Sequence, residues 1–259
     1  MQVVGYQTDG GASEAGNGTA AGPALVVAEE GDVHREPLDP GRTLGYSLGD
    51  RRCAGVLDGA THHDCENEAA PYCDRHSSTW VCARCTGTCL KDEMDCYEEH
   101  AIYLAAFAPA TFKIGVTREW RLDTRLREQG ADRAAHLRTV SNGRIAREIE
   151  SQLAKEYTDR VRVPEKVAGL HRDVDADAWN RTLDEFEPLE TFSFDYGFEL
   201  DAAPVPETLA TGEIVGVQGR VLVLERAGTT YAVDLRDLVG YEISEEETDR
   251  ELQSSLGAF

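Results

Sequence analysis

The sequence predicts an α+β protein, because three kinds of segment follow one another along the chain. Residues 53–100 contain all seven cysteines without a regular hydrophobic period, residues 101–160 show strand and helix patterns, and residues 205–245 repeat a strand–turn pattern. We expect four parts: N-terminal strands with a flexible loop over 1–52, a Cys/His-rich zinc segment over 53–100, an α/β module with a trailing helix over 101–190, and a small antiparallel β domain over 205–245.

The chain is strongly acidic overall and positive in one part. Its 259 residues carry 26 Lys and Arg against 48 Asp and Glu, a formal net charge of −22. The acidic groups are spread along the chain and lysine is scarce, which favours adaptation to molar salt over an acidic binding surface. Residues 111–162 carry 12 basic and 8 acidic groups. This cationic stretch predicts a place for an anionic ligand, with the solvated faces of two Arg-rich helices as the alternative.

Neither a membrane segment nor a secretory signal is evident. No apolar run approaches the ~20 residues that a transmembrane helix needs. The stretch Met1–Tyr6 lacks a basic region followed by an apolar block. We therefore expect a cytoplasmic protein with no membrane partner.

Short strands are expected on both sides of the central segments. Ala24–Ala28 is an apolar run typical of a strand, and it follows the stretch Asp9–Gly22, which is too poor in apolar residues to pack. Near the C-terminus, glycines separate three further strand-like segments, Glu213–Val217, Arg220–Glu225 and Thr230–Leu235. These segments predict a small antiparallel sheet or barrel.

The crowded cysteines indicate a metal rather than disulfides, because cysteines stay reduced in a cytoplasm. Zn²⁺ takes four nitrogen or sulfur ligands in a tetrahedron. The run Cys82-Ala-Arg-Cys85-Thr-Gly87 has the spacing with which two thiolates grip one ion. The candidate ligands number eight, enough for two zinc ions: Cys65, Cys73, His76, Cys82, Cys85, Cys89, Cys96 and His100.

The pairing of these ligands does not follow from the sequence. Cys53 is an alternative ligand, in which case Cys65 or His76 would be free. An iron–sulfur cluster needs four thiolates, and the spacings Cys73-x2-His76 and Cys96-x3-His100 favour zinc over it. Because four ligands leave no position for water, we expect one or two structural zinc ions.

Residues 101–160 have the clearest pattern, in the order β-β-α-β-α. Two strand segments, Ile102–Phe107 and Thr111–Val116, flank a hairpin signal at Ala108-Pro109-Ala110. A helix is expected over Glu119–Gln129. Its apolar positions and its C-terminal cap are, in order, Trp120, Leu122, Leu126 and Gly130. We expect Trp120 to lie in the core.

The second half of this module continues with a strand and a helix. Ala135–Val140 predicts the third strand, and Asn142 is a favourable N-cap for the helix that follows. Ile145, Ile149 and Leu153 recur every four residues and predict the buried face of that helix. A further helix is expected near Ala176–Glu187.

These residues carry a resemblance to known families. The module resembles the GIY-YIG nucleases: Ala101-Ile102-Tyr103 and Lys113-Ile114-Gly115 match the paired strand motifs, Arg125 the helix arginine and Glu150 the later helix glutamate. More narrowly, residues 50–160 resemble the prokaryotic domain of unknown function twenty-seven ninety-seven. The shared motifs are Cys96-x3-His100, Tyr103-Leu-Ala105, Lys113-x-Gly-x-Thr-Arg118 and Gln129-Gly-Ala131.

The resemblance implies a metal-dependent nuclease that acts on DNA or RNA. Tyr103 would help position the attacking water, Arg125 would hold the scissile phosphate, and Glu150 would bind Mg²⁺ or Mn²⁺. The remaining residues implied near the substrate are Lys113, Gly115 for close backbone approach, and Arg118 and Arg121 for flanking phosphates.

Two positions depart from the nuclease motif. Ala101 replaces the glycine of the first strand motif, and Lys113 replaces the tyrosine of the second. A lysine is better suited to binding phosphate than to activating water. Two alternatives therefore remain open: a nucleic-acid-binding protein on the same fold without cleavage, and a protein-interaction scaffold in which zinc is only a staple.

Overall fold

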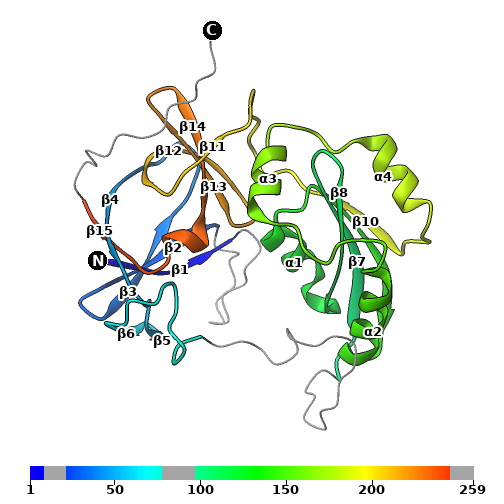
Figure 1. The fold of residues 1–259 in the computed structure, drawn as a ribbon, viewed down its shortest axis with the longest axis horizontal. Helices are drawn as coiled ribbons and strands as arrows, with labels where there is room; N and C mark the ends of the chain where they lie inside the picture. The colour runs from blue at the N-terminus through cyan, green and yellow to red at the C-terminus, as the bar shows by residue number, and fades with distance from the viewer. Residues whose placement is uncertain (9–21, 78–96, 246–259) are drawn as a thin grey trace. The chain divides into compact units, whose positions relative to one another are not determined.

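The computed structural model describes residues 1–8, 22–77 and 97–245, and the chain forms two compact units (Figure 1). The first unit combines Met1–Ser78 with Tyr196–Phe259, and the second is Thr79–Asp195. The α+β class expected from the sequence is confirmed by the mixture of two sheets and a few helices. No helix within the described ranges is long and apolar enough to cross a bilayer.

The first unit contains a large sheet with the strand order β11-β14-β13-β12-β4-β15-β1-β2-β3-β6-β5. Its pairs are antiparallel except β11 with β14. The elements of this unit are β1 (Gln2–Gln7), β2 (Ala24–Glu29), β3 (Asp32–Pro37), β4 (Thr43–Arg51), β5 (Val56–Asp58), β6 (Thr61–His63), β11 (Val205–Pro206), β12 (Ala210–Gln218), β13 (Val221–Arg226), β14 (Thr229–Asp234), α5 (Leu235–Leu238) and β15 (Tyr241–Ser244).

Tight hairpins build this sheet from local sequence. The two-residue turn Ala227–Gly228 joins β13 to β14, and both of its residues have positive φ, 51° and 75°. Glu30–Gly31 joins β2 to β3 with the same signs. Such turns match the right-handed twist of the paired strands, which explains the glycine at the second position. The strands bury a shared apolar core in which Leu25, Val27, Leu222 and Leu224 are fully covered.

The structure corrects the expected division of the chain. The segments 1–52 and 205–245 were expected as separate parts, but their strands lie in one sheet. Ala210 on β12 pairs with Tyr46 on β4, and Glu242 on β15 pairs with Gln2 on β1. The strand assignments over 213–235 are confirmed, and these strands are antiparallel. They belong to a larger sheet, because β12 and β15 pair with strands from the other end of the sequence.

The second unit confirms the expected order β-β-α-β-α. It contains a four-stranded sheet with the order β10-β9-β7-β8. Its elements are β7 (His100–Phe107), β8 (Thr111–Arg118), the 3₁₀ turn η2 (Glu119–Arg121), α1 (Leu122–Gln129), β9 (Arg133–Val140), α2 (Gly143–Leu153), α3 (Val163–Gly169), α4 (Ala176–Leu183) and β10 (Glu190–Ser193). Gly130 ends α1 with φ 67°, and the Asn142 side chain accepts a hydrogen bond from the Ile145 backbone N–H at the start of α2.

The two faces of this sheet bury different helices. Side chains alternate along β7, so Ile102 and Leu104 pack in one cluster with Ala146 of α2. Tyr103 points to the other face and packs with Leu126 of α1. The helices α1 and α2 therefore cover opposite faces, and this division decides which of the predicted site residues can meet.

Two expected core residues lie at the surface instead. Trp120 is 66% exposed, because it falls in the 3₁₀ turn η2 before α1 and not within the helical period. Ile145 is 38% exposed, and its place in the core is taken by Ala146, which is completely buried beside the partly buried Ile149.

Candidate functional site

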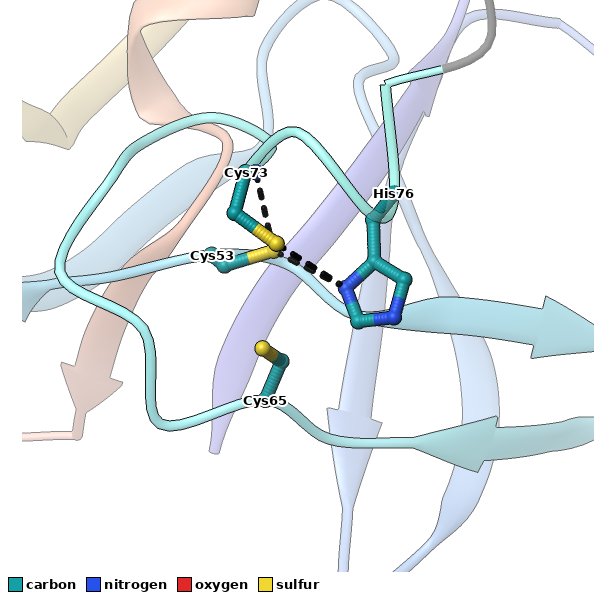
Figure 2. A group of neighbouring side chains, drawn as sticks. All are labelled: Cys53, Cys65, Cys73 and His76. Carbon is teal, nitrogen blue, oxygen red and sulfur yellow. Dashed lines mark hydrogen bonds between the residues drawn. The ribbon is translucent and has the colours of Figure 1, made fainter.

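Three cysteines and a histidine converge in the first unit (Figure 2). Cys53 lies just after β4 and Cys65 just after β6, whereas Cys73 and His76 come from the following loop. The spacing Cys73-x2-His76 forms a turn in which the backbone N–H groups of His76 and Ser77 donate to the Cys73 carbonyl at 2.9 and 2.8 Å. This turn directs Cys73 and His76 toward the same point.

The geometry of the four side chains fits a tetrahedral zinc ion. Their ligand atoms all lie within 4.8 Å of one another. The His76 Nδ1 atom is 3.3 Å from Cys53 Sγ and 3.5 Å from Cys73 Sγ. A tetrahedron with ordinary Zn–S and Zn–N bonds has S···N edges of roughly 3.6 Å. The Cys₃His cluster can therefore hold a zinc ion, through Nδ1 of the histidine.

The surroundings of the cluster shift the pKa values of Cys53 and Cys73 in opposite directions. Burial raises the pKa of the Cys53 thiol. Burial also acts to raise the pKa of Cys73, but backbone N–H groups of Arg75 and His76 and the neighbouring Cys53 lower it by more, so its net shift is downward. The Cys73 backbone N–H lies 3.3 Å from Cys53 Sγ, as a donor to a thiolate would. A bound zinc ion would hold both groups as thiolates.

Hydrogen bonds from neighbouring residues hold the backbone at the ligands Cys53 and Cys65. The Arg52 guanidinium donates to the Cys65 carbonyl at 3.0 Å, and the Gln2 amide donates to the Cys53 carbonyl at 3.4 Å. The Cys53 backbone N–H donates to the Asn67 carbonyl at 2.8 Å. These bonds connect β1 and the end of β4 to the loop that follows β6 and carries Cys65, Cys73 and His76. The loop is therefore hydrogen-bonded to the sheet independently of the metal.

The structure brings together three of the eight predicted zinc ligands, Cys65, Cys73 and His76, and completes the site with Cys53. Spacing alone left Cys53 as an alternative, because it lies far in sequence from the other ligands. His100 lies on β7 in the second unit, where its Nδ1 is 2.7 Å from the Glu98 carbonyl. The remaining predicted ligands, Cys82, Cys85, Cys89 and Cys96, lie outside the described residues.

The α1 face of the second unit brings Tyr103 and Arg125 together. The Tyr103 side chain is buried, and its oxygen accepts a hydrogen bond from the Gln129 amide at 2.6 Å. The Arg125 guanidinium lies near enough to the phenol to interact with it electrostatically. Burial lowers the pKa of Arg125, but the nearby Tyr103 and Glu128 raise it by more. The guanidinium therefore keeps its positive charge beside the phenol.

Further cations join this group. The Lys113 ammonium donates to the side-chain amide oxygen of Gln129 (Oε1) at 2.8 Å and lies 5.9 Å from the centre of the Tyr103 ring. Arg121 and Arg125 share one carboxylate, Glu128, at 2.9 and 3.1 Å. Within the described part of the chain, no carboxylate lies within ion-pair distance of Lys113. We call this the Tyr103 group; it consists of Tyr103, Lys113, Arg121, Arg125, Glu128 and Gln129.

The charge of the Tyr103 group is unbalanced. The group contains three cationic side chains and one carboxylate. Arg121 and Arg125 share the carboxylate of Glu128, and the partner of Lys113 is a neutral amide. About two positive charges are therefore left without a counter-ion inside the group. The arginine side chains are 42% and 44% exposed, so their guanidinium groups remain accessible to an anion from solution. The sequence did not place Gln129 and Glu128 among the expected site residues, because their roles depend on where α1 packs.

Gly115 and Arg118 have roles other than those expected. Gly115 pairs with Tyr103 across β7 and β8, and a Cβ atom at Gly115 would come within 2.5 Å of the Tyr103 Cζ atom. The glycine thus makes space for the phenol of Tyr103. The Arg118 guanidinium is 3.4 Å from the Glu98 carboxylate, outside the Tyr103 group.

Glu150 does not join the Tyr103 group. It lies on α2, the helix that packs on the opposite face of the sheet, and its carboxylate is paired with Arg147 at 2.5 Å. The prediction that Tyr103, Arg125 and Glu150 meet at one phosphate is therefore wrong, because consecutive helices of this unit cover different faces. In the described ranges, the Cys₃His cluster is the only group of three or more such side chains placed to hold a metal. This arrangement gives no support to a Mg²⁺ or Mn²⁺ site at Glu150.

Comparison with known proteins gives the chain a family. A family model described as protein of unknown function, DUF2797, matches residues 60–243. The chain belongs to this family. The DUF2797 match contains Cys65, Cys73 and His76 together with the whole Tyr103 group, whereas Cys53 precedes it. No curated protein and no solved structure matches the chain.

Proposed function

We propose that this DUF2797 protein is a zinc-stapled nucleic-acid-binding protein in which the Tyr103 group holds backbone phosphate without cleaving it. The observation that carries the proposal is the unbalanced charge of that group. Arg121 and Arg125 share a single carboxylate, Glu128, and Lys113 contacts only the neutral Gln129 amide, in a chain whose net charge is −22. A phosphate diester would supply the missing negative charge, and the planar guanidinium groups suit its paired oxygens.

The likeness to GIY-YIG nucleases supports the binding part of this proposal and not the catalytic part. The order β-β-α-β-α and the pair Tyr103 and Arg125 are features expected of that module. Hydrolysis by the expected route needs Glu150 as the metal ligand, and its helix packs on the other face. Lys113, in place of the second motif tyrosine, adds a phosphate-binding cation. We therefore favour binding without cleavage over the nuclease.

The test is a salt titration of binding to short labelled DNA and RNA, measured by fluorescence anisotropy on the zinc-loaded full chain. Each phosphate contact contributes about 0.7 to the slope of log affinity against log salt on single strands. Lys113→Gln and Arg125→Gln should each weaken binding and lower that slope by about 0.7. Slopes equal to that of the unaltered chain would contradict the proposal.

Arg127→Gln is the matched control, because it removes a cation from the same helix without touching the Tyr103 group. Arg127 is paired with Asp123 at 2.9 Å and lies 4.9 Å from the centre of the Phe194 ring. Its replacement should leave the slope nearly unchanged. A parallel incubation with Mn²⁺ tests the second half of the proposal. Cleavage that disappears in Glu150→Gln would overturn binding without hydrolysis and restore the nuclease.

A further inference from the structure

An exposed tryptophan lies beside the Tyr103 group. Trp120 is 66% exposed in the turn η2, which connects β8 to α1. Tryptophan is enriched at interfaces, because its ring offers a large apolar surface and its N–H offers a hydrogen bond. The other described tryptophan, Trp179, is 5% exposed and packs in the core. Trp120 is therefore the unusual one.

The indole is held in place by its neighbours. Its Nε1 donates to the Glu98 carboxylate at 3.0 Å, and the same carboxylate lies 3.4 Å from the Arg118 guanidinium. The Arg121 guanidinium lies 5.9 Å from the centre of the indole ring. Glu98 fixes the edge of the ring, so the ring is oriented before any ligand arrives, which lowers the entropic cost of binding to it.

A chain of contacts connects the indole to the Tyr103 group. Arg121 lies near the Trp120 ring and also donates to Glu128 at 2.9 Å, and Glu128 in turn accepts from Arg125. An aromatic surface and two cations, Arg121 and Arg125, thus follow one another along η2 and α1. A second exposed aromatic, Tyr97, at 79% exposure, precedes β7, and the Glu119 backbone N–H donates to the Glu99 carbonyl at 2.9 Å. Both aromatics therefore lie at the same end of the β7–β8 pair.

We propose that Trp120 stacks on an unpaired base and that the ligand of this module is single-stranded nucleic acid. In a duplex the base faces are covered by their neighbours, and only an unpaired base can present its face to an indole. This inference rests on the proposed function, because the Tyr103 group would hold the phosphates next to the stacked base. Arg121 serves both parts, as a cation near the ring and as a phosphate ligand.

The experiment compares three labelled ligands of equal length: a single strand, the corresponding duplex, and an abasic strand that keeps the phosphates but lacks the bases. The unaltered chain should bind the single strand most tightly. Trp120→Ala should weaken single-strand binding by about 5- to 150-fold, the range expected for the loss of one stacked base. It should leave binding to the abasic strand nearly unchanged. Trp120→Phe keeps an aromatic face and should recover part of the loss.

Salt dependence separates stacking from charge. Stacking does not release counter-ions, so the loss caused by Trp120→Ala should stay constant from low to high KCl. The loss caused by Arg125→Gln should shrink as salt rises. Quenching of intrinsic fluorescence on binding should be present in the unaltered chain and much reduced in Trp120→Phe. Leu189→Ala is the matched control, since Leu189 is a 64% exposed apolar residue of the same unit outside this surface.

The outcomes distinguish this inference from the proposal on which it rests. Single-strand binding that is unchanged in Trp120→Ala but weakened in Arg125→Gln would overturn the stacking inference and leave the phosphate-binding function intact. Equal affinity for single strand, duplex and abasic strand would also overturn it. Failure of the unaltered chain to bind any of the three would contradict the proposed function itself.

Discussion

Replacing Cys53 by serine removes the one zinc ligand that local spacing did not identify. Its thiol lies 3.3 Å from His76 Nδ1 and belongs to a cluster in which all four ligand atoms lie within 4.8 Å. A serine hydroxyl has a similar shape but does not offer the thiolate that zinc prefers. We therefore expect Cys53→Ser to lose the zinc ion of this site while the strands of the first unit remain paired.

The loss of zinc affinity expected in Cys53→Ser follows from the number of ligands that share the binding free energy. Structural zinc binds with about 10–16 kcal/mol of free energy in small zinc peptides. Divided among four ligands, this gives about 2.5–4 kcal/mol for Cys53, or about 100- to 1000-fold in zinc affinity. Removing the Arg52 guanidinium, which donates to the Cys65 carbonyl and does not touch the metal, should lower zinc affinity by less, about 10- to 100-fold.

The assay is competition with a chromophoric zinc chelator under reducing conditions, with metal content measured on the same samples. Cys53→Ser should bind one zinc ion fewer than the unaltered chain. His63→Ala is the control, because His63 is an exposed histidine on β6 outside the cluster. Unchanged zinc content and affinity in Cys53→Ser would refute the assignment of this ligand.

Three further predictions follow from the described contacts. Burial raises the pKa of the Cys53 thiol, so zinc binding at neutral pH should displace its proton. Zinc affinity should then fall about tenfold for each unit by which the pH is lowered. A calorimetric titration in buffers of different ionisation enthalpy measures the number of protons released. Gly115→Ala should lower the free energy of unfolding by about 1–3 kcal/mol in urea, because its Cβ would press on the buried Tyr103 ring, whereas Gly45→Ala, with open space around it, should be near neutral. Asn142→Ala should cost about 1 kcal/mol in the same assay, since it removes the cap of α2.

Sequence reasoning succeeded where the information is local. The strands β7 and β8, the helix α2 and its cap Asn142 each depend on a few neighbouring residues, and the structure confirms them. The turn Cys73-x2-His76 is local in the same way, and it forms half of the zinc site. Local spacing was therefore enough to predict that Cys73 and His76 bind the same metal ion.

Two of the failures depend on distant parts of the chain, and one depends on a local turn. Cys53 joins the zinc site only because β4 ends beside the loop after β6. Trp120 was expected on the buried face of a helix beginning at Glu119. In the structure a 3₁₀ turn occupies Glu119–Arg121 before α1 begins, and Trp120 faces solvent. Glu150 was expected beside Tyr103, and the face on which α2 packs is set by the path of the chain after β9 and not by the residues of the helix.

Photo-cross-linking tests the central claim, that the α1 face of the second unit binds nucleic acid, most directly. A single strand carrying a photoreactive thymidine would be irradiated with the zinc-loaded full chain, and the cross-linked peptides would be mapped by mass spectrometry. The account predicts cross-links to the peptide that carries Trp120, Arg121 and Arg125. Cross-links confined to α2 around Glu150, or to the strands of the first unit, would contradict it.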